Sequence, residues 1–202
     1  MFKAFIAALL VGLTSLVTSA VAGVYYNPED KAIRITGKTT SYQYKYLNDM
    51  LAIKDVRRVY MSGPGGELYA GLAIGRLLHR RGLSVTIPED TICASACALA
   101  AMGSPTLYVD GKLYVHRGYL MMLPAMATPD EFARRSGLGY MDTARYLIEM
   151  GYTLHLNKVI IQNSNPCVFL DMGGKSFIDQ LRTDDPLSVR ENYNMGKVDV
   201  CV

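Results

Sequence analysis

The sequence predicts a single domain of the α/β class, and three observations support this prediction. The chain has 202 residues, half of which are hydrophobic, so it can bury one sizeable core. Residues 57–61, 67–81 and 83–87 have the patterns of a strand, a helix and a strand, which together form a βαβ unit. The chain contains no repeat, low-complexity tract or linker. We therefore expect the strands at 57–61 and 83–87 to be parallel neighbours joined by a right-handed crossover.

The elements before and within this unit follow from local patterns. Residues 31–37 alternate as K-A-I-R-I-T-G and predict a strand, and residues 40–55 carry apolar side chains at helical spacing and predict a helix. The stretch S-G-P-G-G at 62–66 predicts a turn that no regular element would tolerate. The helix at 67–81 has an acidic residue in its first turn and basic residues in its last turn, which suits the helix dipole, and Gly82 caps it.

The second half of the chain predicts further elements of both kinds. Residues 94–102 predict a helix that ends at Gly103. Residues 106–109 and 112–116 predict strands, and the dipeptide Asp-Gly between them is typical of a hairpin turn. The sequence T-P-D-E predicts the start of a helix over 128–135, and 140–161 predicts one long helix with Gly151 as its weak point. From residue 162 the pattern weakens.

The first 22 residues differ in kind from the rest. Lys3 is followed by an uncharged run at 4–24, and A-V-A at 20–22 matches the pattern that signal peptidase requires. We expect a signal peptide over 1–22, a mature domain over 23–202, and a periplasmic or secreted protein. An uncleaved membrane anchor is the alternative, but glycine, serine and threonine residues dilute the hydrophobicity of the run and favour cleavage.

The charge balance argues against a nucleic-acid partner. The chain has 21 basic and 18 acidic residues, a net charge of +3, and the basic residues are scattered along the sequence. A nucleic-acid-binding domain normally concentrates positive charge on one face or stripe, so no such partner is expected.

The four cysteines predict disulfides, because an even number in an exported protein usually pairs. Three pairings are possible, and the first choice joins Cys93 to Cys97 and Cys167 to Cys201. Residues i and i+4 on a helix have Cα atoms about 6 Å apart, which is near the upper end of the range for a disulfide. A zinc site is the weaker alternative, because no histidine has ligand spacing to a cysteine, and no metal is expected.

Three positions can carry chemistry, and each also has an ordinary structural explanation. The glycines of 62–66 can direct backbone N–H groups at an anion near a helix start, or they can simply allow a tight turn, which the loop alone favours. Ser95, within C-A-S-A-C, is a candidate nucleophile at a helix start or an ordinary N-cap. His116 follows a strand, where a lone histidine is more often structural than catalytic.

In their joint order, these positions resemble the Clp protease proteolytic subunit (ClpP), a family within the larger crotonase-like fold. The resemblance rests on S-G-P-G-G at 62–66 followed by A-G-L-A-I at 70–74, on A-S-A around Ser95, and on Val-His ending at His116. The C-terminal family pattern recurs as L-S-x-x-E-x-x-x-x-G-x-V-D at 187–199. Together with the export signal, the flanking cysteines resemble the periplasmic branch of the family.

The resemblance implies a fold built from ββα units and a serine peptidase mechanism. By the family pattern, Ser95 is the nucleophile, His116 its general base, and Asp184 the third triad member, with Asp185 as the rival. The N–H groups of Gly65 and Ala96 would form the oxyanion hole. No cofactor is implied.

The same resemblance implies partners and leaves alternatives. A homo-oligomer is expected, because the family assembles rings, and the helix predicted at 140–161 is a candidate contact. Because the periplasm lacks ATP, no ATPase partner is expected, and the substrates would be peptides or unfolded polypeptides. One alternative is a non-catalytic binding or scaffold protein of the cell envelope. A crotonase-type acyl-thioester enzyme is disfavoured, because coenzyme A esters are not expected outside the cytoplasm and Ser95 would be unexplained.

Overall fold

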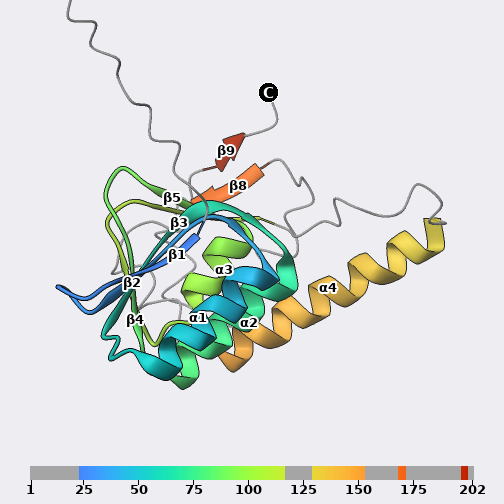
Figure 1. Ribbon diagram of the computed structural model, residues 1–202. Coiled ribbons are helices and arrows are strands. Elements are labelled where there is room, and N and C mark those ends of the chain that lie inside the picture. Colours follow the sequence, from blue (N-terminus) through green and yellow to red (C-terminus); the bar gives the residue numbers. More distant parts are fainter. Residues whose placement is uncertain (1–22, 117–128, 153–167, 172–196, 200–202) are drawn as a thin grey trace, which may run out of the picture.

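A computed structural model describes residues 23–116, 129–152, 168–171 and 197–199, in which four helices pack on a branched nine-stranded sheet (Figure 1). In chain order the elements are β1 (Gly23–Asn27), β2 (Ala32–Thr39), α1 (Ser41–Ile53), β3 (Arg58–Gly66), α2 (Leu68–Arg80), β4 (Ser84–Ile87), β5 (Ile92–Ala94), α3 (Ala96–Met102), β6 (Thr106–Val109), β7 (Lys112–Val115), α4 (Pro129–Glu149), β8 (Val168–Asp171) and β9 (Lys197–Asp199). The predicted signal peptide, residues 1–22, lies outside the described residues.

The predicted βαβ unit is present. Strands β3 and β4 pair in parallel, with Arg58 opposite Ser84, and helix α2 connects them. The apolar face of α2 is buried in the hydrophobic core, to which it contributes Leu72, Ile74 and Leu78. The expectation that these two strands are parallel neighbours is therefore confirmed.

The sheet divides at β3, and this corrects the interpretation of S-G-P-G-G as a turn. The first half of β3 pairs with β4, which pairs with β6, whereas Gly63 in the second half pairs with Cys93 of β5. The strand continues through the glycines, and Gly65 and Gly66 pair with Lys38 and Thr39 of β2 after a register shift. The strand changes direction at these residues, where Gly65 has a φ of 92°. Glycine tolerates such positive φ values, so the segment can bend and still remain paired in the sheet.

The predicted hairpin between 106–109 and 112–116 is wrong. Strand β6 pairs in parallel with β4, and β7 pairs in parallel with β5, so the two strands lie in different branches of the sheet. The N–H groups of Asp110 and Gly111 both donate to the carbonyl of Ile87, at 3.0 and 3.1 Å. The Asp-Gly turn is therefore hydrogen-bonded to the end of β4. Strands β6 and β7 each pair with a parallel strand, β4 and β5 respectively, and not with one another.

Two helix predictions also change. The helix predicted at 94–102 begins at Ala96, because Ile92–Ala94 forms strand β5. The helices predicted at 128–135 and 140–161 form one helix, α4, which ends just before Gly151 at a φ of 85°. Residues 153–161 lie outside the described residues. The C-terminal half of α4 is anchored by the fully buried side chains of Tyr146 and Leu147, which stabilises a helix that includes two glycines.

The helices form a layer whose contacts depend on small residues. A Cβ on Gly75 of α2 would overlap the hydroxyl of Tyr146 from α4, and this hydroxyl donates to the carbonyl of Leu99 in α3 at 2.7 Å. Tyr146 thus joins three helices at one point. The opposite end of α4 extends away from the body of the molecule (Figure 1).

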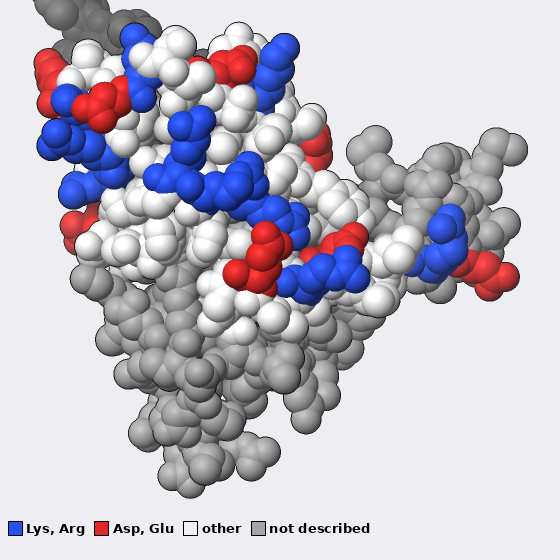
Figure 2. Space-filling view, turned by 90° about the horizontal axis from the view of Figure 1, so that it is seen from below, with Lys and Arg blue, Asp and Glu red and all other residues white. Residues whose placement is uncertain are grey.

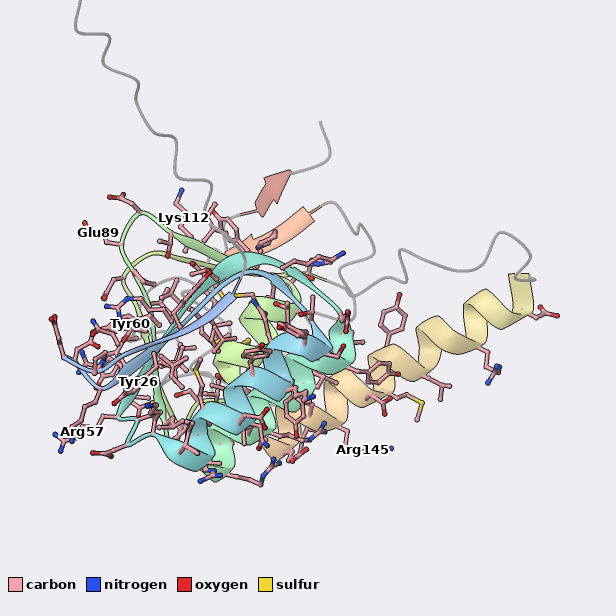
Figure 3. All side chains as sticks on the ribbon, viewed as in Figure 1. Tyr26, Arg57, Tyr60, Glu89, Lys112 and Arg145 are labelled. Carbon is pink, nitrogen blue, oxygen red and sulfur yellow. A yellow bond between two sulfur atoms is a disulfide. The ribbon has the colours of Figure 1, made fainter. Side chains whose placement is uncertain are left out.

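Charged residues gather away from this packed interior. The face in Figure 2 carries a band of lysine and arginine side chains with acidic groups beside it. Figure 3 places Tyr26, Arg57 and Tyr60 at one side of the molecule and Arg145, on α4, at another. The Lys31 ammonium lies 2.6 Å from the Asp55 carboxylate and lowers the pKa of Asp55, although such an exposed pair contributes little stability. Within the described residues, no helix is long and apolar enough to cross a membrane.

Candidate active site

Two of the predicted site residues meet at one edge of the sheet. Strands β5 and β7 are parallel neighbours, with Ala94 opposite Tyr114, so the residues that follow them emerge side by side. Ser95 follows β5 and His116 follows β7. Ligand sites of α/β sheets commonly lie outside the carboxyl ends of parallel strands, which is the edge where both side chains lie.

Ser95 adopts a conformation that is unusual for a residue with a side chain. Its φ is 56° and its ψ is −124°, a sparsely populated combination that costs about 1–3 kcal/mol and needs support from its surroundings. Its N–H donates to the carbonyl of Tyr114 at 2.9 Å, and its carbonyl accepts from the N–H of Leu99 at 3.0 Å. A sharp strand-to-helix turn of this kind is how the nucleophile elbow of α/β-hydrolases exposes a serine hydroxyl.

The hydroxyl of Ser95 is hydrogen-bonded to the imidazole of His116. The distance from Oγ to Nε2 is 2.7 Å, and both residues are half-buried. With its proton on Nδ1, the imidazole accepts the serine O–H at Nε2, the geometry in which a histidine activates a hydroxyl as general base. The Nδ1 atom on the far side of the ring is buried.

A disulfide bridges the turn that presents Ser95. Cys93 in β5 is bonded to Cys97 in α3, with their Cα atoms 5.3 Å apart and both side chains buried. This predicted pairing is confirmed, although it joins a strand end to a helix start rather than two turns of one helix. The bond closes the turn on both sides of the serine, and it therefore restricts the positions that Ser95 can take.

The backbone of Gly65 lies against this turn. A Cβ at Gly65 would lie 2.6 Å from Cβ of Ser95 and 2.9 Å from the backbone nitrogen of Ala96, and its φ is 92°. Only glycine fits such a close approach. The N–H of Ala96 belongs to the first turn of α3, where N–H groups have no acceptor within the helix. The structure thus brings the two predicted oxyanion-hole residues together beside Ser95.

The remaining predicted residues lie outside the described part of the chain. These are Asp184 with its rival Asp185, and the second cysteine pair, Cys167 and Cys201. The described strands nearest to that pair are antiparallel neighbours, with Val168 of β8 opposite Asp199 of β9. Both cysteines lie outside the described residues, so this register does not test the Cys167–Cys201 disulfide, which remains a prediction.

One supporting group of the site could not be found from the sequence. The carbonyl of Tyr114 accepts a hydrogen bond from the N–H of Ser95. Because both groups belong to the main chain, any residue type could form this bond, and the sequence does not reveal it. It depends on the parallel pairing of β5 and β7, which the predicted hairpin would have prevented. Within residues 23–116 and the other described ranges, no group of three or more potential ligands could hold a metal ion.

Comparison with known proteins supports the fold. No family model matches the chain, and no curated protein matches it. Among solved structures, the fold resembles a protein described as the 1510-N membrane-bound stomatin-specific protease. A lysine-to-alanine variant in complex with a substrate peptide has a TM-score of 0.50 and 16% identity, and the match covers 84% of this chain and 85% of that one. A serine-to-alanine variant has a TM-score of 0.48 and 16% identity, and it covers 74% of both chains. The predicted ClpP-like α/β fold class is confirmed.

Proposed function

We propose that this protein is an exported serine peptidase of the Clp-like type that hydrolyses peptides or unfolded polypeptides without ATP. The observation that carries the proposal is the hydrogen bond of 2.7 Å between Ser95 Oγ and His116 Nε2. The strained turn that presents Ser95 supports it, because such strain persists where a side chain must be held in a functional position. The fold likeness also supports it, since the protein with that fold is described as a protease.

The proposed reaction uses these groups in two steps. In the first, Ser95 Oγ bonds to the carbonyl carbon of the substrate while its proton moves to Nε2 of His116, and the negative oxygen accepts hydrogen bonds from the N–H groups of Gly65 and Ala96. Each such donor is typically worth ~3 kcal/mol in the transition state. The C–N bond then breaks, and His116 returns the proton to the leaving amine. In the second step a water molecule gives a proton to His116 and bonds to the acyl carbon, the bond from that carbon to Ser95 Oγ breaks, and His116 returns the proton to Oγ.

Asp184 is proposed as the group that orients His116. A carboxylate at Nδ1 would fix the tautomer that leaves Nε2 free to accept the serine proton, and it would stabilise the imidazolium. The buried position of Nδ1 supports this role, because a buried ring nitrogen needs a polar partner. Asp185 is the rival for the same role.

We further propose that the protein forms a homo-oligomer through α4. Three apolar side chains of this helix are substantially exposed, with exposed fractions of 46% for Leu138, 60% for Met141 and 52% for Ile148. Exposed apolar side chains on one projecting helix are typical of a protein–protein contact. No nucleic acid or ATPase is proposed as a partner.

The hydrolysis assay tests the proposed activity. The purified protein should cleave an unfolded polypeptide, such as reduced and alkylated casein, in the absence of ATP, and a tightly folded protein should resist because no unfoldase opens it. Peptide products would be detected by mass spectrometry. If neither unfolded polypeptide nor short peptides are cleaved, the non-catalytic scaffold alternative is supported instead.

Intact-mass measurement tests export and the number of disulfides together, and peptide mapping without reduction shows which cysteines are paired. We expect protein from the periplasmic fraction to begin at Gly23 and to be lighter than its reduced form by the four hydrogens that two disulfides remove. A full-length mass in the cytoplasm would contradict export. A mass deficit of only two hydrogens would mean that a single disulfide is present, and a peptide map that shows only Cys93 bonded to Cys97 would contradict the Cys167–Cys201 pairing.

A further inference from the structure

A pocket lined by tyrosines lies between α1 and the edge of the sheet. Its volume is about 240 Å³, and we name it the tyrosine pocket after its three aromatic side chains; it is lined by Gly23, Val24, Tyr25, Lys38, Thr40, Tyr42, Gln43 and Tyr46. The rings of Tyr42 and Tyr46 lie 4.4 Å apart at an interplanar angle of 43°, and all three tyrosine side chains are exposed. Exposed aromatic rings grouped around a hollow are more typical of a binding site than of a core.

The wall of the tyrosine pocket contains a buried acceptor. Gln43 is only 3% exposed, and its Nε2 donates to the carbonyl of Thr36 at 2.8 Å, which fixes the orientation of the amide. Its Oε1 is also buried, and no hydrogen-bond donor of the described residues reaches it. A buried acceptor without a hydrogen-bond donor lowers the stability of the folded protein, and a donor that reaches it removes this cost. If a lining side chain moves to uncover Oε1, an occupant with an apolar body and an N–H or O–H group can supply this donor.

The tyrosine pocket lies along the same edge of the sheet as Ser95. Lys38, in its wall, pairs with Gly65 of the neighbouring strand β3, and Gly65 lies against Ser95, which directly follows β5. Neighbouring strands are about 4.8 Å apart, so two steps place the pocket wall roughly 10 Å from Ser95. An extended peptide advances about 3.3 Å per residue and spans this distance in about three residues.

We propose that the tyrosine pocket is a substrate subsite that binds a tryptophan or tyrosine side chain, about three residues from the bond that Ser95 attacks. This inference rests on the proposed function, because it assumes a peptide extended across the sheet edge. The volume suits one large side chain, since pockets for larger organic ligands usually exceed 300 Å³. The three rings can pack against an aromatic side chain, and its polar hydrogen can bond to Gln43 Oε1 once a lining side chain moves to uncover that atom. The charge of Lys38 disfavours a cationic side chain in the same place.

Equilibrium binding tests the subsite without requiring catalysis. Dye-labelled decapeptides carrying one tryptophan, moved through each position of an otherwise fixed sequence, would be titrated with the Ser95→Ala protein and followed by fluorescence anisotropy. We expect one position at which tryptophan binds about five- to tenfold more tightly than alanine, the range typical of aromatic packing. Tyr42→Ala in the same background should remove this preference, and Tyr42→Phe should retain most of it. Tyr69→Ala, which removes another exposed tyrosine, on α2, should leave the preference unchanged.

The outcomes separate this inference from the proposed function. Equal affinity for tryptophan and alanine at every position, a preference that survives in Tyr42→Ala, or no measurable binding of any peptide would each overturn the subsite. Reaction of wild-type Ser95 with a small fluorophosphonate probe does not require the tyrosine pocket to be filled. A protein that reacts with the probe but shows no aromatic preference would therefore retain its proposed activity and lose only the subsite.

Discussion

Replacing Ser95 with alanine should reduce peptide hydrolysis by about 10⁴-fold or more while the protein remains folded. The hydroxyl that bonds to His116 is the only group in the turn that can form the acyl-enzyme, and its loss removes both steps of the reaction. Alanine fits the space of serine, and the disulfide between Cys93 and Cys97 still holds the turn. Initial rates of peptide cleavage, with circular dichroism to verify folding, are the measurement.

Two further variants complete this test. His116→Gln should lower the rate nearly as much as Ser95→Ala, and the double variant should be no slower than either, because nucleophile and base act as one unit. Ser84→Ala is the matched control, since this half-buried serine lies at the start of β4 and its Oγ donates to the main-chain carbonyl of Arg57 at 3.4 Å. Additive losses in the double variant, or more than a tenth of wild-type activity in Ser95→Ala, would contradict the assigned roles.

Replacing Gly65 with alanine should reduce hydrolysis by about 10³-fold and also destabilise the protein. The new Cβ would lie 2.6 Å from Cβ of Ser95, so the turn must shift, and a φ of 92° is strained for alanine. The shift moves Ser95 relative to His116 and displaces one proposed oxyanion donor, whose loss alone costs 10²–10³-fold in comparable enzymes. Rates of peptide cleavage and urea denaturation of the same samples would measure both effects.

Gly137→Ala is the matched control for this variant. Gly137 lies within α4, and a Cβ there meets no atom within 4 Å. Alanine is favoured over glycine inside a helix by about 1 kcal/mol, so this variant should be as active as the wild type and slightly more stable. If Gly65→Ala were as active as Gly137→Ala, the close approach of Gly65 to Ser95 would have no role in the reaction.

The sequence predicted the parts of the fold that depend on local pattern. The βαβ unit around α2 was found because its helix has a buried face and charged ends, and its strands are short and apolar. Ser95 and His116 were found because their motifs and joint order resemble those of the Clp protease family, and the pairing of β5 with β7 brings them within 2.7 Å. Cys93 and Cys97 were paired from their spacing and the expected compartment.

The errors arose where a tertiary partner decides the structure. Asp110-Gly111 has the composition of a hairpin turn, but β6 pairs with β4 and β7 pairs with β5, so each strand lies beside a parallel partner that is distant in the sequence. The glycines of β3 were interpreted as a break, whereas they allow one strand to pair with β2, β4 and β5 in turn. Neither outcome is encoded in the local pattern, because both depend on strands distant in the sequence.

The measurement that tests the central claim most directly is covalent labelling with a fluorophosphonate probe, followed by peptide mapping of the labelled protein. We predict a single modified residue, Ser95, because its hydroxyl alone among the described serines is hydrogen-bonded to an imidazole that can accept its proton. The label should be absent from Ser95→Ala and from protein unfolded before the probe is added. A native protein that takes up no label, or that carries the label at a residue other than Ser95, would contradict the account.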